Sequence, residues 1–149
     1  MLDDSGLSEV VSSQPFEGTC HCGAIGYIYR TALPTHEWTI RECQCRFCRT
    51  HAALSTSDPA GSLEFVEFDR DAMRRYQFGL RSADFLLCGN CGVYVGALMQ
   101  TRVKRFGIIN VRALNLSMAS LPEVVEISYE GEEMAERLAR RENRWTPVA

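Results

Sequence analysis

The chain has 149 residues, of which 46% are hydrophobic and 23% charged, and its formal net charge is -3. These values are typical of a globular domain large enough to fold without disulfides, and they exclude a disordered chain or a fibrous repeat. The slightly acidic balance provides no overall basic field, so we expect neither nucleic acid nor an anionic membrane as a partner.

The start of the chain resembles neither a signal peptide nor a membrane anchor. Residues 1–14 are polar and acidic, and no apolar run approaches the ~18 residues of a membrane span. We therefore expect a cytoplasmic protein. Residues 1–15 show no clear period and are expected to form a flexible leader, followed by a single domain over residues 16–149.

Short stretches of alternating β-forming residues dominate the rest of the chain. In the first of them Ile25, Tyr27 and Tyr29 share one side, the period of a half-buried strand. Strands are predicted over residues 24–30, 36–41, 63–68, 75–78, 84–87, 93–99, 105–111 and 124–129, and residues 53–57 are expected to be extended. A helical turn is predicted over 46–53, and a longer helix over 131–143. The sequence thus predicts a mainly β domain of several hairpins with a C-terminal helix.

All seven cysteines fall into three clusters with spacings typical of metal ligands. The clusters are Cys20 and Cys22; Cys43, Cys45 and Cys48; and Cys88 and Cys91. An odd number of cysteines cannot all pair within one chain, and disulfides rarely persist in the reducing cytoplasm. Four plus three cysteines divide naturally into two metal sites, so we expect two zinc ions per chain.

The two outer pairs are predicted to form a structural zinc site. Cys20 and Cys22 would face the same side of an extended strand, and Cys88-x2-Cys91 followed by Gly92 has the form of a zinc-binding turn. Together they supply the four thiolates of a closed tetrahedral site. The alternatives are four buried cysteines without a metal, and an iron–sulfur cluster.

The central cluster offers three ligands and leaves a fourth position open, which is typical of catalytic zinc. Cys43 and Cys45 would share one strand face, and Cys48 would join them from the following turn. Three thiolates outweigh the 2+ charge of zinc, so a soft fourth ligand such as a substrate thiol suits the metal better than water. The pattern therefore favours thiol activation, with Cys43, Cys45 and Cys48 as the catalytic centre.

His51 offers an alternative for this second site. It follows Cys48 by three residues, so in a helical segment both side chains lie on one face. A site of three thiolates and the His51 imidazole would be closed and structural, with no room for a substrate.

Five segments resemble the glutathione-dependent formaldehyde-activating enzyme family, which also includes centromere protein V. The segments are 18–27 (GTCHCGAIGY), 43–49 (CQCRFCR), 85–92 (FLLCGNCG), 109–114 (INVRAL) and 144–147 (RWTP). The resemblance implies the β-tent (Mss4-like) fold, with a structural zinc on the outer four cysteines and a catalytic zinc on the central three. It also implies a carbon–sulfur lyase-type activity in which the sulfur of glutathione adds to formaldehyde, giving S-hydroxymethylglutathione.

A glutathione site needs cations or backbone donors for two carboxylates. Arg46 and Arg49 flank Cys48 and are the expected contacts, and Phe47 and Tyr94 are candidates for the walls of the cleft. The expected partners are thus a small-molecule thiol, glutathione or similar, and a small carbonyl. Two other functions fit the same cysteines: a non-catalytic zinc-stabilised binding module of the β-tent fold, and a thiol redox protein.

Overall fold

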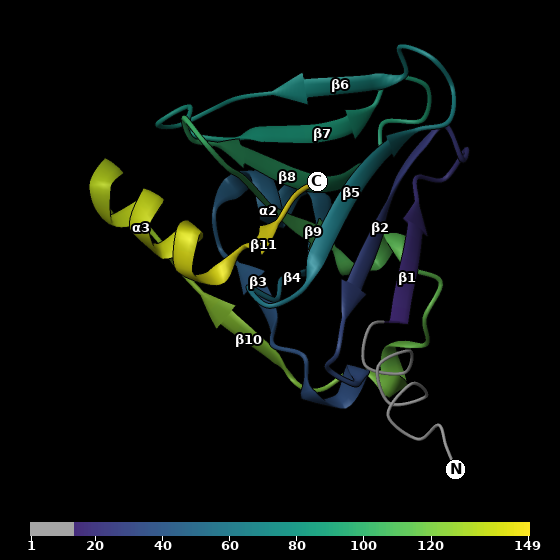
Figure 1. The fold of residues 1–149 in the computed structure, drawn as a ribbon, viewed down its shortest axis with the longest axis horizontal. Coiled ribbons are helices and arrows are strands. Elements are labelled where there is room, and N and C mark those ends of the chain that lie inside the picture. The colour runs from purple at the N-terminus through teal and green to yellow at the C-terminus, as the bar shows by residue number, and fades with distance from the viewer. Residues whose placement is uncertain (1–13) are drawn as a thin grey trace.

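The computed structural model describes residues 14–149, in which the strands form two sheets (Figure 1). The smaller sheet has the antiparallel order β1 (Gln14–Thr19), β2 (Ile25–Thr31) and β5 (Ser62–Glu67). It lies on the right in Figure 1, apart from the β6–β7 hairpin at the top and from α3 and β10 on the left.

The larger sheet is mixed. Its order is β10 (Val124–Ile127), β3 (Ile40–Cys43), β4 (Ser55–Thr56), β9 (Arg105–Asn110), β8 (Tyr94–Gln100), β7 (Asp84–Cys88) and β6 (Met73–Tyr76), and β11 (Thr146–Pro147) also pairs with β9. The β10–β3 pair is parallel and the other pairs are antiparallel. Two α-helices are present in the described part of the chain, α2 (Arg46–His51) and α3 (Met134–Arg144).

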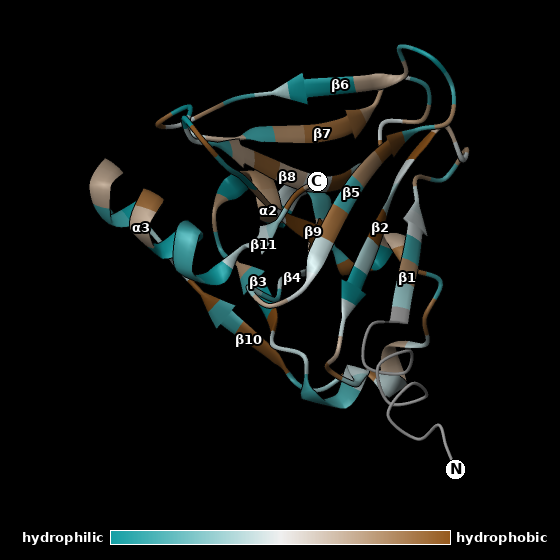
Figure 2. Cartoon of the chain, viewed as in Figure 1, coloured by the Kyte–Doolittle hydropathy of each residue, from teal (hydrophilic) through white to brown (hydrophobic). Residues whose placement is uncertain are grey.

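The core forms around β2 and β8. Tyr27 and Tyr29 of β2 are buried, and the Tyr29 ring packs edge-on against Trp38 at 5.5 Å between centroids. Strand β8 is buried from Tyr94 to Met99 because side chains cover both of its faces. Figure 2 shows the matching hydrophobic stretches on β5, β7 and β8.

Helix α3 contributes one side chain to the cluster on the second face of β8. Leu138 of α3 packs with Ala97, Met99 and Trp145 in a small cluster separate from the main core. A capping box at Glu133 and Glu136 begins the helix, and Trp145 ends it by returning to extended backbone that leads into β11. The mainly β class with a C-terminal helix is confirmed. No helix among residues 14–149 is long and apolar enough to cross a membrane.

Three sequence expectations need correction. The strand expected over 36–41 begins only at Ile40, because Thr35–Glu37 form a 3-10 helix that leads the chain to the buried Trp38. The strand expected over 75–78 is Met73–Tyr76. Strand β1 already begins at Gln14, inside the leader expected over residues 1–15. Residues 1–13 of that leader lie outside the described part of the chain.

Candidate metal centres and the adjoining cavity

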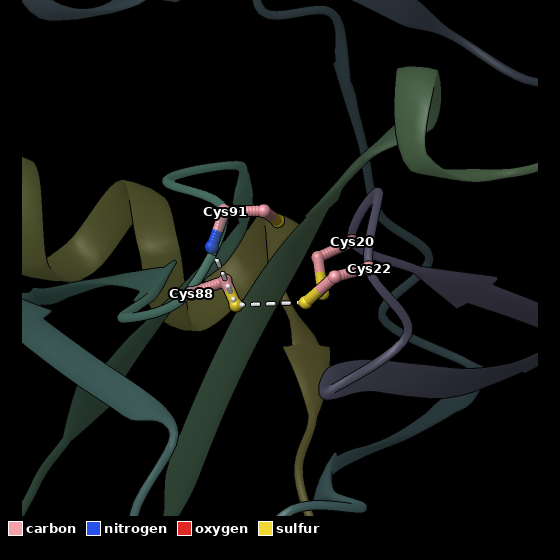
Figure 3. A group of neighbouring side chains, drawn as sticks. All are labelled: Cys20, Cys22, Cys88 and Cys91. Atoms are coloured by element: carbon pink, nitrogen blue, oxygen red, sulfur yellow. Dashed lines mark hydrogen bonds between the residues drawn. The ribbon is translucent and has the colours of Figure 1, made fainter.

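The sulfurs of the outer four cysteines converge between two turns (Figure 3). The Cys22 sulfur lies 3.8 Å from that of Cys20 and 3.6 Å from that of Cys88, and all four ligand atoms lie within 4.8 Å of one another. A tetrahedral zinc with Zn–S bonds of ~2.3 Å requires sulfurs about 3.8 Å apart. The spacing of the sulfurs therefore fits a closed four-thiolate site.

Backbone geometry in both turns supports these thiolates. The amides of Asn90 and Cys91 donate to the Cys88 sulfur at 3.3 and 3.4 Å, and the amide of Ile25 donates to the Cys20 sulfur at 3.4 Å. Such donors stabilise the charged form of a thiol. Gly92 follows the second turn with φ of 83°, a conformation that disfavours a side chain.

The strand geometry expected for Cys20 and Cys22 is wrong. Strand β1 ends at Thr19 and β2 begins at Ile25, so both cysteines lie in the connecting turn. The amide of Gly23 donates to the Cys20 carbonyl at 3.2 Å and closes this turn. The two sulfurs thus converge through a tight turn similar to that of Cys88 and Cys91, and not through a shared strand face.

The central three sulfurs also lie within 4.8 Å of one another. Cys43 is the last residue of β3, Cys45 caps the N-terminus of α2, and Cys48 lies in the first turn of that helix. The Cys48 amide donates to the Cys45 sulfur at 3.4 Å. The end of β3 is held in place by the amide of Gln44, which donates to the carbonyl of Ile127 in β10 at 2.9 Å.

The electrostatics of this cluster favour a cation. Hydrogen bonds from the Cys43 and Cys48 thiols lower the pKa of Cys45 to about 2. The same contacts raise the pKa of Cys48, and the hydrogen bond to Cys45 raises that of Cys43. Three thiolates this close repel one another unless a metal balances their charge. The donor set therefore fits a soft cation such as zinc.

The structure places His51 away from the three sulfurs. Its ring stacks on Phe47 at 4.5 Å between centroids and lies 5.9 Å from the ring of Tyr94. Within the described part of the chain, the group of ligand atoms around Cys43 contains the three sulfurs and no His51 nitrogen. His51 and Phe47 instead line another cavity, together with Tyr76 and Phe78.

A cavity of about 420 Å³ adjoins the central cysteines. Its lining includes Cys43, Cys45, Cys48, six arginines (Arg41, Arg46, Arg49, Arg137, Arg140 and Arg141), the carboxylate of Glu130, and the aromatic residues Phe78, Phe85, Tyr94, Tyr129 and Trp145. The volume and the mixed lining are typical of a small-molecule site. Arg46, Arg49 and Tyr94 are thus brought to one cavity as expected, whereas Phe47 is not part of its wall.

Sequence reasoning missed four of the arginines. Arg41 comes from β3, and Arg137, Arg140 and Arg141 come from α3. Glu132 pairs with Arg137 at 3.1 Å and with Arg140 at 2.8 Å. Arg137, Arg140 and Arg141 have i, i+3, i+4 spacing in the predicted helix, which indicates one basic face. This spacing did not show which surface that face would meet.

Tyr94 lies in the cavity wall as expected, and its side chain is buried there. Its side chain is 2% exposed, and its hydroxyl has no hydrogen-bond partner among the described residues. Burial, and secondarily the charge of the central cysteines, raises the pKa of this phenol well above its ordinary value. The side-chain amide of Asn110 donates to the Tyr94 carbonyl at 2.8 Å and fixes the strand at this point.

Comparison with known proteins places the chain in a family. The model of the family described as "Glutathione-dependent formaldehyde-activating enzyme" matches residues 15–130. A crystal structure of a Rhodobacter sphaeroides protein is similar at 28% identity and a TM-score of 0.56, over 74% of this chain and 99% of that one. A comparison with curated proteins found no match. Since the family model covers well over half of the sequence, the chain belongs to the glutathione-dependent formaldehyde-activating enzyme family.

Proposed function

We propose that the chain is a zinc-dependent enzyme of the carbon–sulfur lyase type that joins a small-molecule thiol to a small carbonyl. Glutathione and formaldehyde are the pair that the family description suggests. One observation carries the proposal: the three central cysteines line a cavity large enough for a substrate. The cytoplasm, where thiols stay reduced, is the compartment that suits this chemistry.

The central cysteines have a defined role in this proposal. Cys43, Cys45 and Cys48 would hold the second zinc, next to the cavity that they line. With zinc bound there, its charge would lower the pKa of a substrate thiol, and three thiolates would favour such a soft further ligand. Cys20, Cys22, Cys88 and Cys91 hold the structural zinc.

Tyr94 is the proposed proton donor. As the substrate sulfur forms a bond to the carbonyl carbon, the π electron pair moves to the oxygen, which must receive a proton. Tyr94 lines the cavity, and its buried hydroxyl is unpartnered among the described residues and stays protonated because its pKa is high. It can donate first a hydrogen bond and then its proton to this oxygen, and water restores the proton.

Arg46 and Arg49 are proposed to contact the substrate at the exposed part of the lining. Arg49 is already oriented, since its Nε donates to the carbonyl of Gln44 at 2.9 Å. Cations at this position attract a thiol that carries carboxylates.

Turnover and metal content together test the proposal. The zinc-loaded protein should accelerate formation of S-hydroxymethylglutathione from glutathione and formaldehyde, followed by exchange NMR. Cys45→Ser should abolish this rate while the protein keeps its fold and its outer zinc. Failure of the wild type to accelerate the reaction with two zincs bound would instead favour a non-catalytic zinc-stabilised module.

A second variant separates an open metal site from one closed by His51. His51→Leu preserves an apolar contact with Phe47 but removes the imidazole. With an open site the variant retains two zincs and wild-type turnover. Loss of the second zinc in this variant would show that His51 is a ligand and would contradict the catalytic proposal.

A further inference from the structure

Arg141 is a buried cation without an anionic partner among the residues that the structure describes. Its side chain is 6% exposed, and its Nε has no hydrogen-bond partner among residues 14–149. One Nη donates to the hydroxyl of Ser82 at 2.8 Å, and the guanidinium carbon lies 4.7 Å from the centre of the Trp145 ring. Burying a charge is costly unless an opposite charge compensates it. The site around Arg141 therefore lacks an anion.

Arg41 of β3 is only half-buried, but it too lacks an anionic partner among the described residues. Its Nη donates to the hydroxyl of Ser57 at 2.7 Å. None of the ion pairs in the described part of the chain involves Arg41 or Arg141, and Glu132 is held by two other arginines. Burial, and then the neighbouring arginines, lowers the pKa of Arg141 to about 10, and burial also lowers the pKa of Arg41.

Both arginines line the cavity that contains the central cysteines. Arg46 and Arg49 line it too, but they are exposed, so water already solvates their charge. An anion gains more from a cation that is shielded from water. Arginine also binds carboxylate and phosphate through two parallel hydrogen bonds.

We propose that Arg41 and Arg141 form a subsite for an anionic oxygen group, a carboxylate or a phosphate, on the ligand whose thiol meets Cys43, Cys45 and Cys48. The position of the thiol rests on the proposed function, whereas the anion subsite rests on the two arginines. Arg141 lies in α3, beyond residues 15–130 matched by the family model. The subsite thus joins a residue of β3 to one of the C-terminal helix.

Binding of ligands with a blocked thiol tests the subsite without turnover. One pair of probes is S-methylglutathione and its dimethyl ester, which differ in the carboxylate charge. The other pair is S-methylated 4′-phosphopantetheine and S-methylated pantetheine, which differ in the phosphate. Calorimetry gives the affinity, and the fluorescence of Trp145 in the cavity wall reports on the location, since the other tryptophan, Trp38, packs in the core against Phe16 and Tyr29.

The charged member of at least one pair should bind the zinc-loaded protein at least tenfold more tightly than its neutral partner, and that pair identifies the anionic group. Arg141→Met and Arg41→Met should each reduce this affinity about tenfold or more. Arg102→Met, which removes the same charge from an exposed position outside the cavity, should bind as the wild type does. Arg141→Lys provides a variant that keeps the charge, and it should bind more weakly because the planar fork is lost.

Equal affinity for the charged and neutral members of both pairs would overturn the subsite, as would wild-type binding by Arg41→Met and Arg141→Lys. The outcome is independent of catalysis. Charge-dependent binding without any turnover of thiol and formaldehyde would leave the subsite standing and remove the proposed reaction.

Discussion

The sulfur of Cys22 lies 3.6 Å from the sulfur of Cys88, although 66 positions separate the two residues in the sequence. Cys22 belongs to the turn between β1 and β2, and Cys88 ends β7, so the contact joins the small sheet to the large one. A metal bound at this point links the two sheets.

Cys22→Ser should therefore lower stability and remove the outer zinc. Loss of one of four thiolates opens a structural site whose binding energy contributes to folding. We expect a loss of roughly 3 kcal/mol and a fall in Tm of about 6 to 12 °C, measured by thermal unfolding together with zinc content. His21→Ala changes an exposed residue of the same turn and should keep both values. An unchanged zinc content in Cys22→Ser would contradict the four-thiolate site.

Tyr94→Phe should reduce turnover without reducing stability. The hydroxyl has no partner to lose among the described residues, so its removal relieves the cost of burying a polar group. Loss of a proton donor should lower kcat by about 10² to 10⁴-fold. Tyr29→Phe is the matched control, because Tyr29 has another buried, unpartnered hydroxyl and lies outside the cavity lining. Equal kcat values for the two variants would remove Tyr94 from the mechanism.

Gly26→Ala should destabilise the small sheet. A Cβ at this position would lie 2.2 Å from the carbonyl oxygen of Gly18 on the paired strand β1, so the strands would have to separate. Overpacking of this kind costs about 1 to 3 kcal/mol, which denaturant unfolding measures. Gly79→Ala serves for comparison, since a Cβ there meets nothing within 4 Å and only the φ of 60° is unfavourable. A smaller loss for Gly26→Ala than for Gly79→Ala would contradict this packing argument.

Glu132→Gln should destabilise the protein at neutral pH and less so in acid. Hydrogen bonds from Arg140, and also from Arg137, hold the pKa of Glu132 below its ordinary value of 4.5. A carboxyl group whose pKa is lower in the folded state stabilises the fold at pH values above its unfolded-state pKa. This contribution is lost as the pH falls through the folded-state pKa. We expect a difference of roughly 1 to 2 kcal/mol at neutral pH, shrinking below a pH of about 4.5.

Denaturant unfolding of Glu132→Gln and wild type from pH 7 to acid measures this difference. Glu142→Gln neutralises an exposed carboxylate of the adjoining helix α3 and should follow the wild type at every pH. A stability difference that stays constant through the acid range would show that the ion pairs with Arg137 and Arg140 contribute nothing.

The sequence was most informative where the chemistry is local. The Cys88-x2-Cys91-Gly turn is formed by five consecutive residues, so its spacing alone predicts the turn and its amide donors. The strands of the mainly β domain were predictable for the same reason, since alternation within a few residues decides which side is buried. Local patterns did not distinguish the turn of Cys20 and Cys22 from a strand, because a two-residue spacing fits both.

The cysteine spacings and strand periods thus determined, from the sequence alone, the class of the fold and the residues able to bind metal. Only the tertiary structure decided what surrounds the central cysteines. Docking of α3 brings Arg141 to the cavity that Arg41 reaches from β3, and the fold brings the ring of Tyr94 to 5.9 Å from that of His51. These neighbours come from distant parts of the chain, and their positions are fixed by tertiary packing. The spacing of residues in the sequence does not predict such contacts.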